Sequence, residues 1–140
     1  MSNLIDLLQD KVLLCDGAMG TQVQSYDLDI EADFLGKENC PEILLLSRSD
    51  IIRDIHTAYL AAGSDVIQTN TFGASPLTLA EFELEDQAFE INKCAGELAC
   101  EAIEEFSGDG RARFVLGAIG PGTRLPSLGH ISYIDLYEAL

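Results

Sequence analysis

Short, continuously apolar runs alternate along this chain with longer segments in which apolar residues recur at helical spacing. The runs cover residues 11–16, 65–69 and 112–119. They do not alternate between apolar and polar positions, which is typical of parallel strands buried on both faces. The order strand, helix, strand, helix, strand and start of a helix predicts parallel strands with helices packed outside them.

Three helices are expected after these strands. The first begins at or just before Ser49, whose hydroxyl is expected to cap the first turn, and it ends at Gly63. The second spans about residues 85–106, and the third begins at residue 132. The apolar face of the first is expected at Ile51, Ile52, Ile55, Ala58, Tyr59 and Ala62. That of the second is expected at Ala88, Phe89, Ile91, Ala95, Leu98, Ala99, Ala102, Ile103 and Phe106.

The predicted fold class is α/β, but three strand–helix units do not complete a known fold of this class. An eight-stranded barrel needs typically about 250 residues, and a flavodoxin-like sheet needs about five strands. Three parallel strands would leave two unpaired edges and an uncovered face. The simplest interpretation is that residues 1–140 are the N-terminal part of a larger domain.

Composition excludes several classes of function. Hydrophobic residues make up 47% of the chain, which argues against disorder, and the net charge of −16 argues against nucleic acid or an acidic membrane as a partner. Residues 1–8 lack the basic segment of a signal peptide, and no apolar stretch is long enough to span a membrane, so a cytoplasmic location is expected. The four cysteines form no C-x-x-C or other compact zinc spacing and are interpreted as ordinary thiols.

The carboxyl ends of the three predicted strands are polar, small and glycine-rich, and ligands of α/β proteins bind at such ends. Asp16 follows four apolar residues and precedes Gly17, so its carboxylate is expected at the rim of the sheet. It could hold an ammonium group, act as a general base, or only close an Asp-Gly turn. Thr69 and Asn70 offer neutral polar groups for a zwitterionic or amide-bearing ligand, or serve only to cap a turn.

Other readings of polar and glycine-rich residues are weaker. His56 in a helix and His130 in a loop lack a second metal ligand at useful spacing, so a packing or surface role is favoured. The glycines at residues 17–20 lack the G-x-G-x-x-G order, and residues 117–122 lack the Lys-Ser/Thr pair of a phosphate-binding loop. Dinucleotide and nucleoside triphosphate binding are therefore not predicted.

The same strand ends resemble the homocysteine S-methyltransferase family. The matching motifs lie in order along nearly the whole chain, which makes the set specific although each piece alone is not. Ala18-Met19-Gly20-Thr21 and Gly120-Pro121 are most similar to the cobalamin-dependent methionine synthase branch. The segments that carry the resemblance are residues 14–22, 50–65, 68–72 and 117–123.

The resemblance implies the first three βα units of a (β/α)₈ TIM barrel that binds homocysteine, with Asp16 and Gly17 near the substrate's amino group and Thr69 and Asn70 lining the pocket. It also implies a zinc ion that activates the homocysteine thiol, and methylcobalamin and methyltetrahydrofolate on downstream domains. Family members hold zinc with three cysteines of later strands, two of them adjacent. This sequence has no adjacent cysteines, so the zinc ligands are expected outside it, and no catalytic or metal-binding residue is assigned within residues 1–140.

Two other functions remain open from the sequence. The chain could be a truncated, non-catalytic or interaction module that folds only with a partner. It could also belong to a homocysteine methyltransferase that uses betaine or S-methylmethionine as the methyl donor. The activity predicted from the resemblance is methyl transfer to homocysteine, which gives methionine, and the isolated chain is expected to be inactive.

Overall fold

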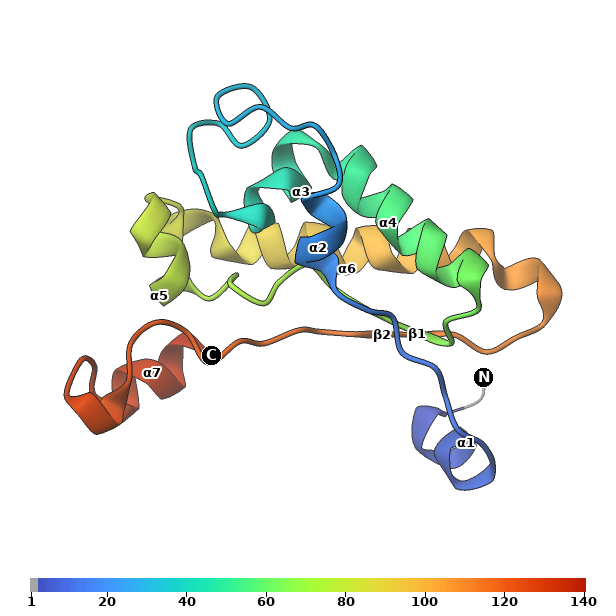
Figure 1. Cartoon of the computed structure of the whole chain (residues 1–140). Coiled ribbons are helices and arrows are strands. Elements are labelled where there is room, and N and C mark those ends of the chain that lie inside the picture. Colours follow the sequence, from blue (N-terminus) through green and yellow to red (C-terminus); the bar gives the residue numbers. More distant parts are fainter. Residues whose placement is uncertain (1–2) are drawn as a thin grey trace.

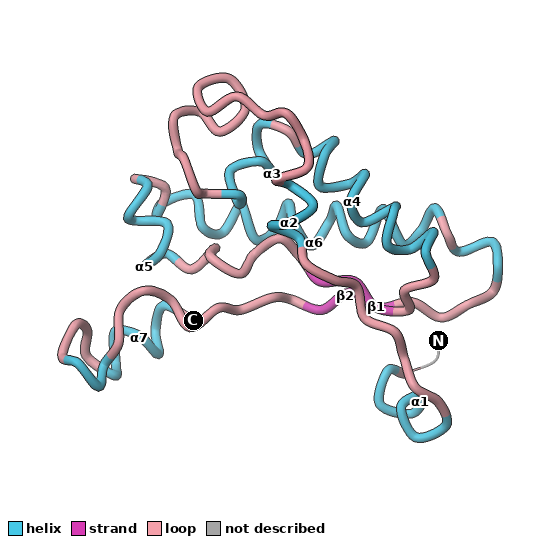
Figure 2. The backbone as a smooth tube through the Cα atoms, viewed as in Figure 1, coloured by secondary structure: helices cyan, strands magenta, loops and turns pink. Residues whose placement is uncertain are grey.

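A computed structural model describes residues 3–140 of the chain. Its centre is a layer of two long helices, α4 (Ser49–Ala62) and α6 (Ala88–Glu105), which pack side by side. They cover one face of a short parallel sheet formed by β1 (Val66–Gln68) and β2 (Phe114–Leu116) (Figures 1 and 2). The α/β class predicted from the sequence is therefore confirmed.

The sheet keeps the predicted strand order and direction, but its strands are shorter than the apolar runs. β1 pairs in parallel with β2, with Ile67 opposite Val115. The predicted first strand contributes only a single parallel bridge, from Cys15 to Val66. Hydrogen bonds from the Asp16 amide to the Val66 carbonyl (2.9 Å) and from the Val66 amide to the Leu14 carbonyl (3.0 Å) hold it beside β1.

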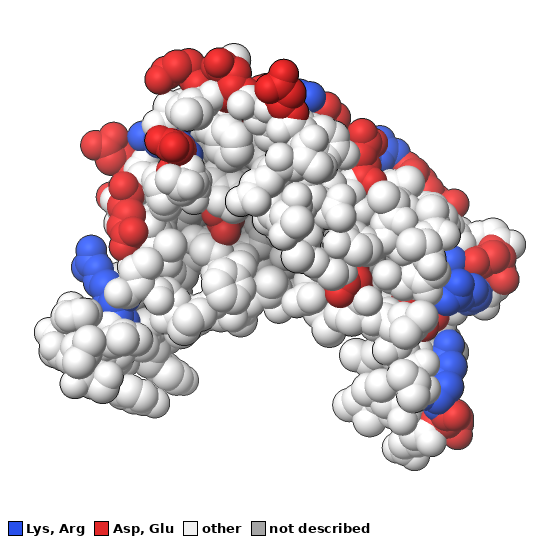
Figure 3. All heavy atoms as spheres, in the orientation of Figure 1, with Lys and Arg blue, Asp and Glu red and all other residues white. Residues whose placement is uncertain are grey.

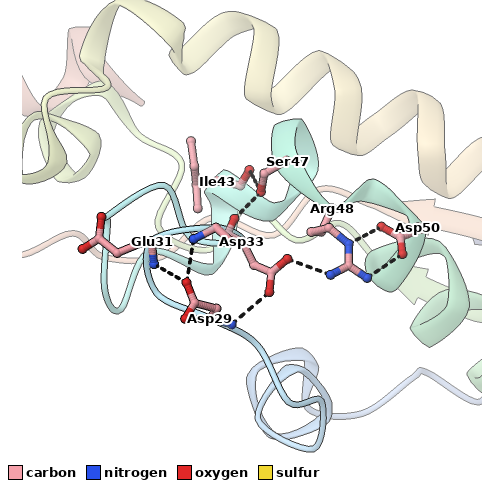
Figure 4. Close-up of polar contacts among 8 residues, drawn as sticks. Asp29, Glu31, Asp33, Ile43, Ser47, Arg48 and Asp50 are labelled. Atoms are coloured by element: carbon pink, nitrogen blue, oxygen red, sulfur yellow. Dashed lines mark hydrogen bonds and ion pairs between the residues drawn. The ribbon is translucent and has the colours of Figure 1, made fainter.

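The start of α4 differs from the prediction in one respect. The helix begins at Ser49, but the cap position belongs to Arg48, so the expected capping role of Ser49 is wrong. The Arg48 guanidinium instead binds both oxygens of Asp50 in the first turn, at 2.9 Å each, and Asp33 at 2.7 Å (Figure 4). The helix ends as predicted at Gly63, whose φ of 110° lies in the left-handed region that favours glycine.

The long segment between Gly17 and Leu46 is held together by acidic side chains that bind its own backbone (Figure 4). The Asp29 carboxylate accepts hydrogen bonds from the amides of Glu31 (2.9 Å) and Ala32 (2.7 Å), and the Asp33 carboxylate accepts one from the Asp29 amide (2.9 Å). These carboxylates give an otherwise irregular loop a defined shape.

The helix faces are mostly those predicted, with three exceptions. Phe89 on α6 is 73% exposed, although the helical spacing predicts it on the buried face. Ala58 and Ala62 on α4 are also exposed, and His56 and Leu60 are buried in their place. Residues three and four apart share a helix face, whereas neighbours in sequence do not, so Phe89 points away once Ala88 and Ile91 face inward.

The remaining elements are short. They join the glycine-rich and polar strand ends to the helical layer, except for α1 and α7, which project away from that layer (Figure 1). They are α1 (Leu4–Asp10), α2 (Met19–Val23), η1 (Pro41–Ile43), α3 (Leu44–Ser47), α5 (Pro76–Leu79), η2 (Ala80–Phe82), η3 (Glu85–Gln87), η4 (Ser107–Asp109), η5 (Pro126–Leu128) and α7 (Tyr133–Ala139).

The side of the sheet opposite the helices is open. Val12 and Leu14 beside β1 are 85% and 59% exposed, and Ile119 after β2 is 71% exposed. Acidic side chains follow the convex outer side of the molecule, whereas its hollow underside is largely uncharged (Figure 3). Within residues 3–140, no helix has the length and apolar character needed to cross a membrane.

Candidate functional site

A pocket of about 430 Å³ lies beyond the carboxyl end of β1. Its walls come from the segment after Cys15, the start of η1, the loop after β1 and the segment after β2. The residues that line it are Asp16, Gly17, Ala18, Met19, Gly20, Pro41, Glu42, Gln68, Thr69, Asn70, Phe72 and Ala118. The four residues singled out from the sequence, Asp16, Gly17, Thr69 and Asn70, are therefore brought together, while their role in binding a substrate stays a prediction.

Asp16 is half-buried, and its carboxylate bridges to β1. One oxygen accepts a hydrogen bond from the Gln68 backbone amide at 2.9 Å, and the other accepts one from the Gln68 side-chain amide at 3.2 Å. The carboxylate thus fixes the neighbouring strand end instead of closing a turn in its own loop. Both donors are neutral amides, so these two contacts give Asp16 no cationic partner and leave that position to a ligand in the pocket.

Asn70 and Glu42 tie η1 to the loop after β1. The Asn70 side-chain amide donates to the Pro41 carbonyl at 2.9 Å, and the Glu42 carboxylate accepts from the Gly73 amide at 2.7 Å. Glu42 is only 6% exposed. A Cβ on Gly73 would lie 2.8 Å from a Glu42 carboxylate oxygen, so a side chain there would force the carboxylate to move.

The charges around this pocket are unbalanced. Among the described residues that line it, Asp16 and Glu42 carry carboxylates, and none is Lys, Arg or His. A buried carboxylate without a cationic partner is unfavourable in a low-dielectric environment. The pocket therefore favours a ligand with a positively charged group that can also donate hydrogen bonds.

The wall that carries Asp16 rests on α4. The Tyr59 hydroxyl donates to the Ala18 carbonyl at 3.4 Å, and a Cβ on Gly17 would lie 2.9 Å from the Tyr59 oxygen. His56, one turn earlier, is fully buried, and neither ring nitrogen has a hydrogen-bond partner among the described residues. Burial lowers the pKa of His56, and the charge of Asp16 opposes that shift. Of the two roles expected for His56, packing and surface, its burial shows the packing role.

Glu42 is the residue of this site that the sequence did not reveal. It lies in a long irregular segment in which acidic residues are frequent, and nothing in its local pattern separates it from exposed ones. Its burial depends on Gly73, which lies far along the chain. Gln68, which holds Asp16, was recognised only as part of a strand end.

The cysteines do not form a metal site in the described part of the chain. All four are free thiols, and Cys15 and Cys100 are exposed, whereas Cys40 is buried. Burial raises the pKa of Cys40 to about 11, with a further contribution from the nearby charge of Glu42, so this thiol stays protonated at neutral pH. No three His, Cys, Asp or Glu side chains between residues 3 and 140 are grouped so that they could hold a metal ion.

Known proteins resemble this chain along nearly its whole length. The family described as homocysteine S-methyltransferase matches residues 13–140. The methionine synthase of Mycobacterium tuberculosis (strain ATCC 25618 / H37Rv) is 40% identical over 138 residues, which cover 99% of this chain but 12% of that protein. The methionine synthase of Mycobacterium leprae (strain TN) is 39% identical over 138 residues, with 99% and 11% coverage.

Solved structures show the same relationship at the level of the fold. The oxidized form of the homocysteine methyltransferase MmuM from Escherichia coli superimposes with a TM-score of 0.68 at 29% identity, covering 84% of this chain and 40% of that one. Its metallated form gives a TM-score of 0.68 at 26% identity, with 96% and 43% coverage. The chain thus spans about an eighth of the curated relatives and less than half of these structures.

Proposed function

The chain belongs to the homocysteine S-methyltransferase family, as its motifs predicted, and we propose that residues 1–140 are the N-terminal part, three βα units, of a (β/α)₈ barrel that binds homocysteine. In this proposal the barrel is the methyl-accepting module of a methionine synthase. The 40% identity to a methionine synthase supports this branch. The open apolar side of the sheet supports a barrel, because further strands and the barrel interior would cover it.

The observation that carries the proposal is the pocket with two carboxylates and no cation in its described lining. Homocysteine has an ammonium group, and such a pocket stabilises it by charge-assisted hydrogen bonds. We assign Asp16 as the main partner of that group, with Gly17, Thr69 and Asn70 forming the surrounding wall. Glu42 adds a second negative charge to the same pocket.

The cofactors of the reaction are proposed to bind elsewhere. The four cysteines do not gather into a site in the described residues, so the chain as described does not fit a zinc ion. Zinc ligands are therefore expected outside residues 1–140, and methylcobalamin and methyltetrahydrofolate on further domains, in keeping with the much greater length of the methionine synthase relatives. The four free thiols support a cytoplasmic location, where cysteines stay reduced.

The methyl donor separates the leading proposal from its alternative. The gene product that carries this sequence should convert homocysteine to methionine with methylcobalamin, and not with betaine or S-methylmethionine. Each donor would be supplied with a labelled methyl group, and labelled methionine would be quantified. Transfer from betaine or S-methylmethionine alone would reassign the donor, and transfer from none of the three would refute the proposed activity.

A further inference from the structure

Two hydrogen bonds of threonine hydroxyls connect the loop after β1 with the segment after β2, and a third contact joins the two threonines to each other. The Thr71 hydroxyl donates to the Ala118 carbonyl at 2.8 Å, and the Ala118 amide donates to the Thr69 hydroxyl oxygen at 3.0 Å. The two threonine hydroxyls are 2.7 Å apart. Thr69 and Thr71 are both buried, at 7% and 6% exposure, and only Thr69 lines the pocket that also holds Asp16.

These distances fix the direction of the bond between the two hydroxyls. A hydroxyl has one hydrogen and two acceptor positions, whereas a carbonyl can only accept. Thr71 therefore uses its hydrogen on Ala118, and the short contact between the threonines is satisfied only if Thr69 donates to Thr71. No other arrangement satisfies all three bonds.

The hydroxyl of Thr69 consequently has no hydrogen to give to a ligand. Its oxygen accepts the Ala118 amide, and one acceptor position remains. Any group that meets this oxygen from the pocket must be a donor, which an ammonium is and a carboxylate is not. The carboxylate of Asp16, on the same pocket, has the same preference.

We propose that Thr71 is a positioning residue that commits the hydroxyl hydrogen of Thr69, so that Thr69 acts toward the ligand only as an acceptor and favours the ammonium end of the amino acid. This inference rests on the proposed function, since it concerns the orientation of homocysteine in its pocket. Thr71 itself does not line the pocket and acts through Thr69.

The test compares two ligands on Thr71→Val and Thr71→Ser variants of the gene product that carries this sequence. L-homocysteine and 4-sulfanylbutanoate share the thiol and the carboxylate, but only the first has an amino group. Calorimetric titration gives both dissociation constants, and their ratio measures the preference for the ammonium. Thr71→Val should reduce this ratio about tenfold, as expected for one hydrogen bond to a charged group, because the freed hydrogen of Thr69 then opposes the ammonium. Thr71→Ser keeps the hydroxyl and should keep the wild-type ratio.

The possible failures are distinguishable. If Thr71→Val weakens both ligands equally, or if the Ser and Val variants behave alike, Thr71 has only a structural role and the inference is wrong. If the wild-type protein does not bind homocysteine, the proposed function fails first. If Thr71→Val does not fold, NMR spectroscopy of the wild-type protein tests the inference instead. The Thr69 hydroxyl proton should be slowly exchanging in NMR spectra and directed at Thr71, and a freely exchanging proton would overturn the inference.

Discussion

Replacing Asp16 by Asn removes the charge of the candidate site with little change of shape. The Asn oxygen can keep the 2.9 Å hydrogen bond from the Gln68 backbone amide. The new amide then faces the Gln68 side chain, now 3.2 Å away, which can rotate to present its oxygen. The link between the first strand segment and β1 is therefore expected to survive, and the melting temperature should change little.

Homocysteine binding, in contrast, should fall substantially. A hydrogen bond to a charged group contributes about 1.5–3 kcal/mol, and a factor of ten in affinity corresponds to about 1.4 kcal/mol. The dissociation constant should therefore rise roughly ten- to a hundredfold. Glu42 lines the same pocket and keeps part of the negative charge, which favours the lower end of this range.

The assay is a titration of homocysteine into the wild type and two variants of the gene product. Asp54→Asn, at an exposed position on α4, is the matched control and should bind as the wild type does. Zinc content should be the same in all three, because Asp16 is not expected to be a zinc ligand. Equal homocysteine affinity in wild type and Asp16→Asn would remove Asp16 from the site and leave it a purely structural link to Gln68.

Three further outcomes are expected. Gly17→Ala should weaken homocysteine binding, because its Cβ would lie 2.9 Å from the Tyr59 oxygen, and adding Tyr59→Phe should restore part of the loss; a Gly17→Ala protein with wild-type affinity would contradict this packing. The Asp29 amide and then Arg48 lower the pKa of Asp33 in the folded protein. The stabilisation from these contacts is complete above the unfolded pKa of about 3.9 and is lost as the pH drops through the lower folded pKa. The free energy of unfolding should therefore decrease as the pH falls below about 4. Urea unfolding should be measured from about pH 2 to about pH 6, on either side of the unfolded pKa. The free energy of unfolding should depend less on acid in Arg48→Met than in the wild type. The 140-residue chain alone should contain no stoichiometric zinc and transfer no methyl group, and metal analysis that finds one tightly held zinc per chain would refute this.

The sequence predicted the parts of the fold that depend on local pattern. Helical periodicity located α4 and α6 within a few residues, and Gly63 marked an end that its positive φ explains. Cap chemistry was less predictable, because Arg48 and not Ser49 occupies the cap position, and its side chain binds Asp33 in a distant loop. Strand length was overestimated, since an apolar run shows that residues are suited to a strand but not how far a neighbouring strand accompanies them.

The candidate site was predictable where it depends on strand ends and unpredictable where it depends on long-range pairing. Parallel strands bring their carboxyl ends to one edge, which is why Asp16, Thr69 and Asn70 share a pocket. The buried Glu42 carboxylate pairs with the Gly73 amide, and the inferred hydroxyl direction of Thr69 depends on Thr71, whose own hydroxyl donates to the distant Ala118 carbonyl. Neither relationship has a signature in the chain itself.

The polar groups of this chain suit the binding of an ammonium and not the activation of a thiol. Its pocket presents carboxylates and hydroxyl oxygens, which suit an ammonium, whereas its described cysteines form no cluster that could activate a thiol. On the proposed function, the ammonium end of homocysteine does not change during methyl transfer, so substitutions in this pocket should remove binding shared by substrate and transition state. Such losses raise KM and leave kcat nearly constant. On the same proposal, the residues that determine kcat are expected around the sulfur of homocysteine, away from the groups that hold its ammonium.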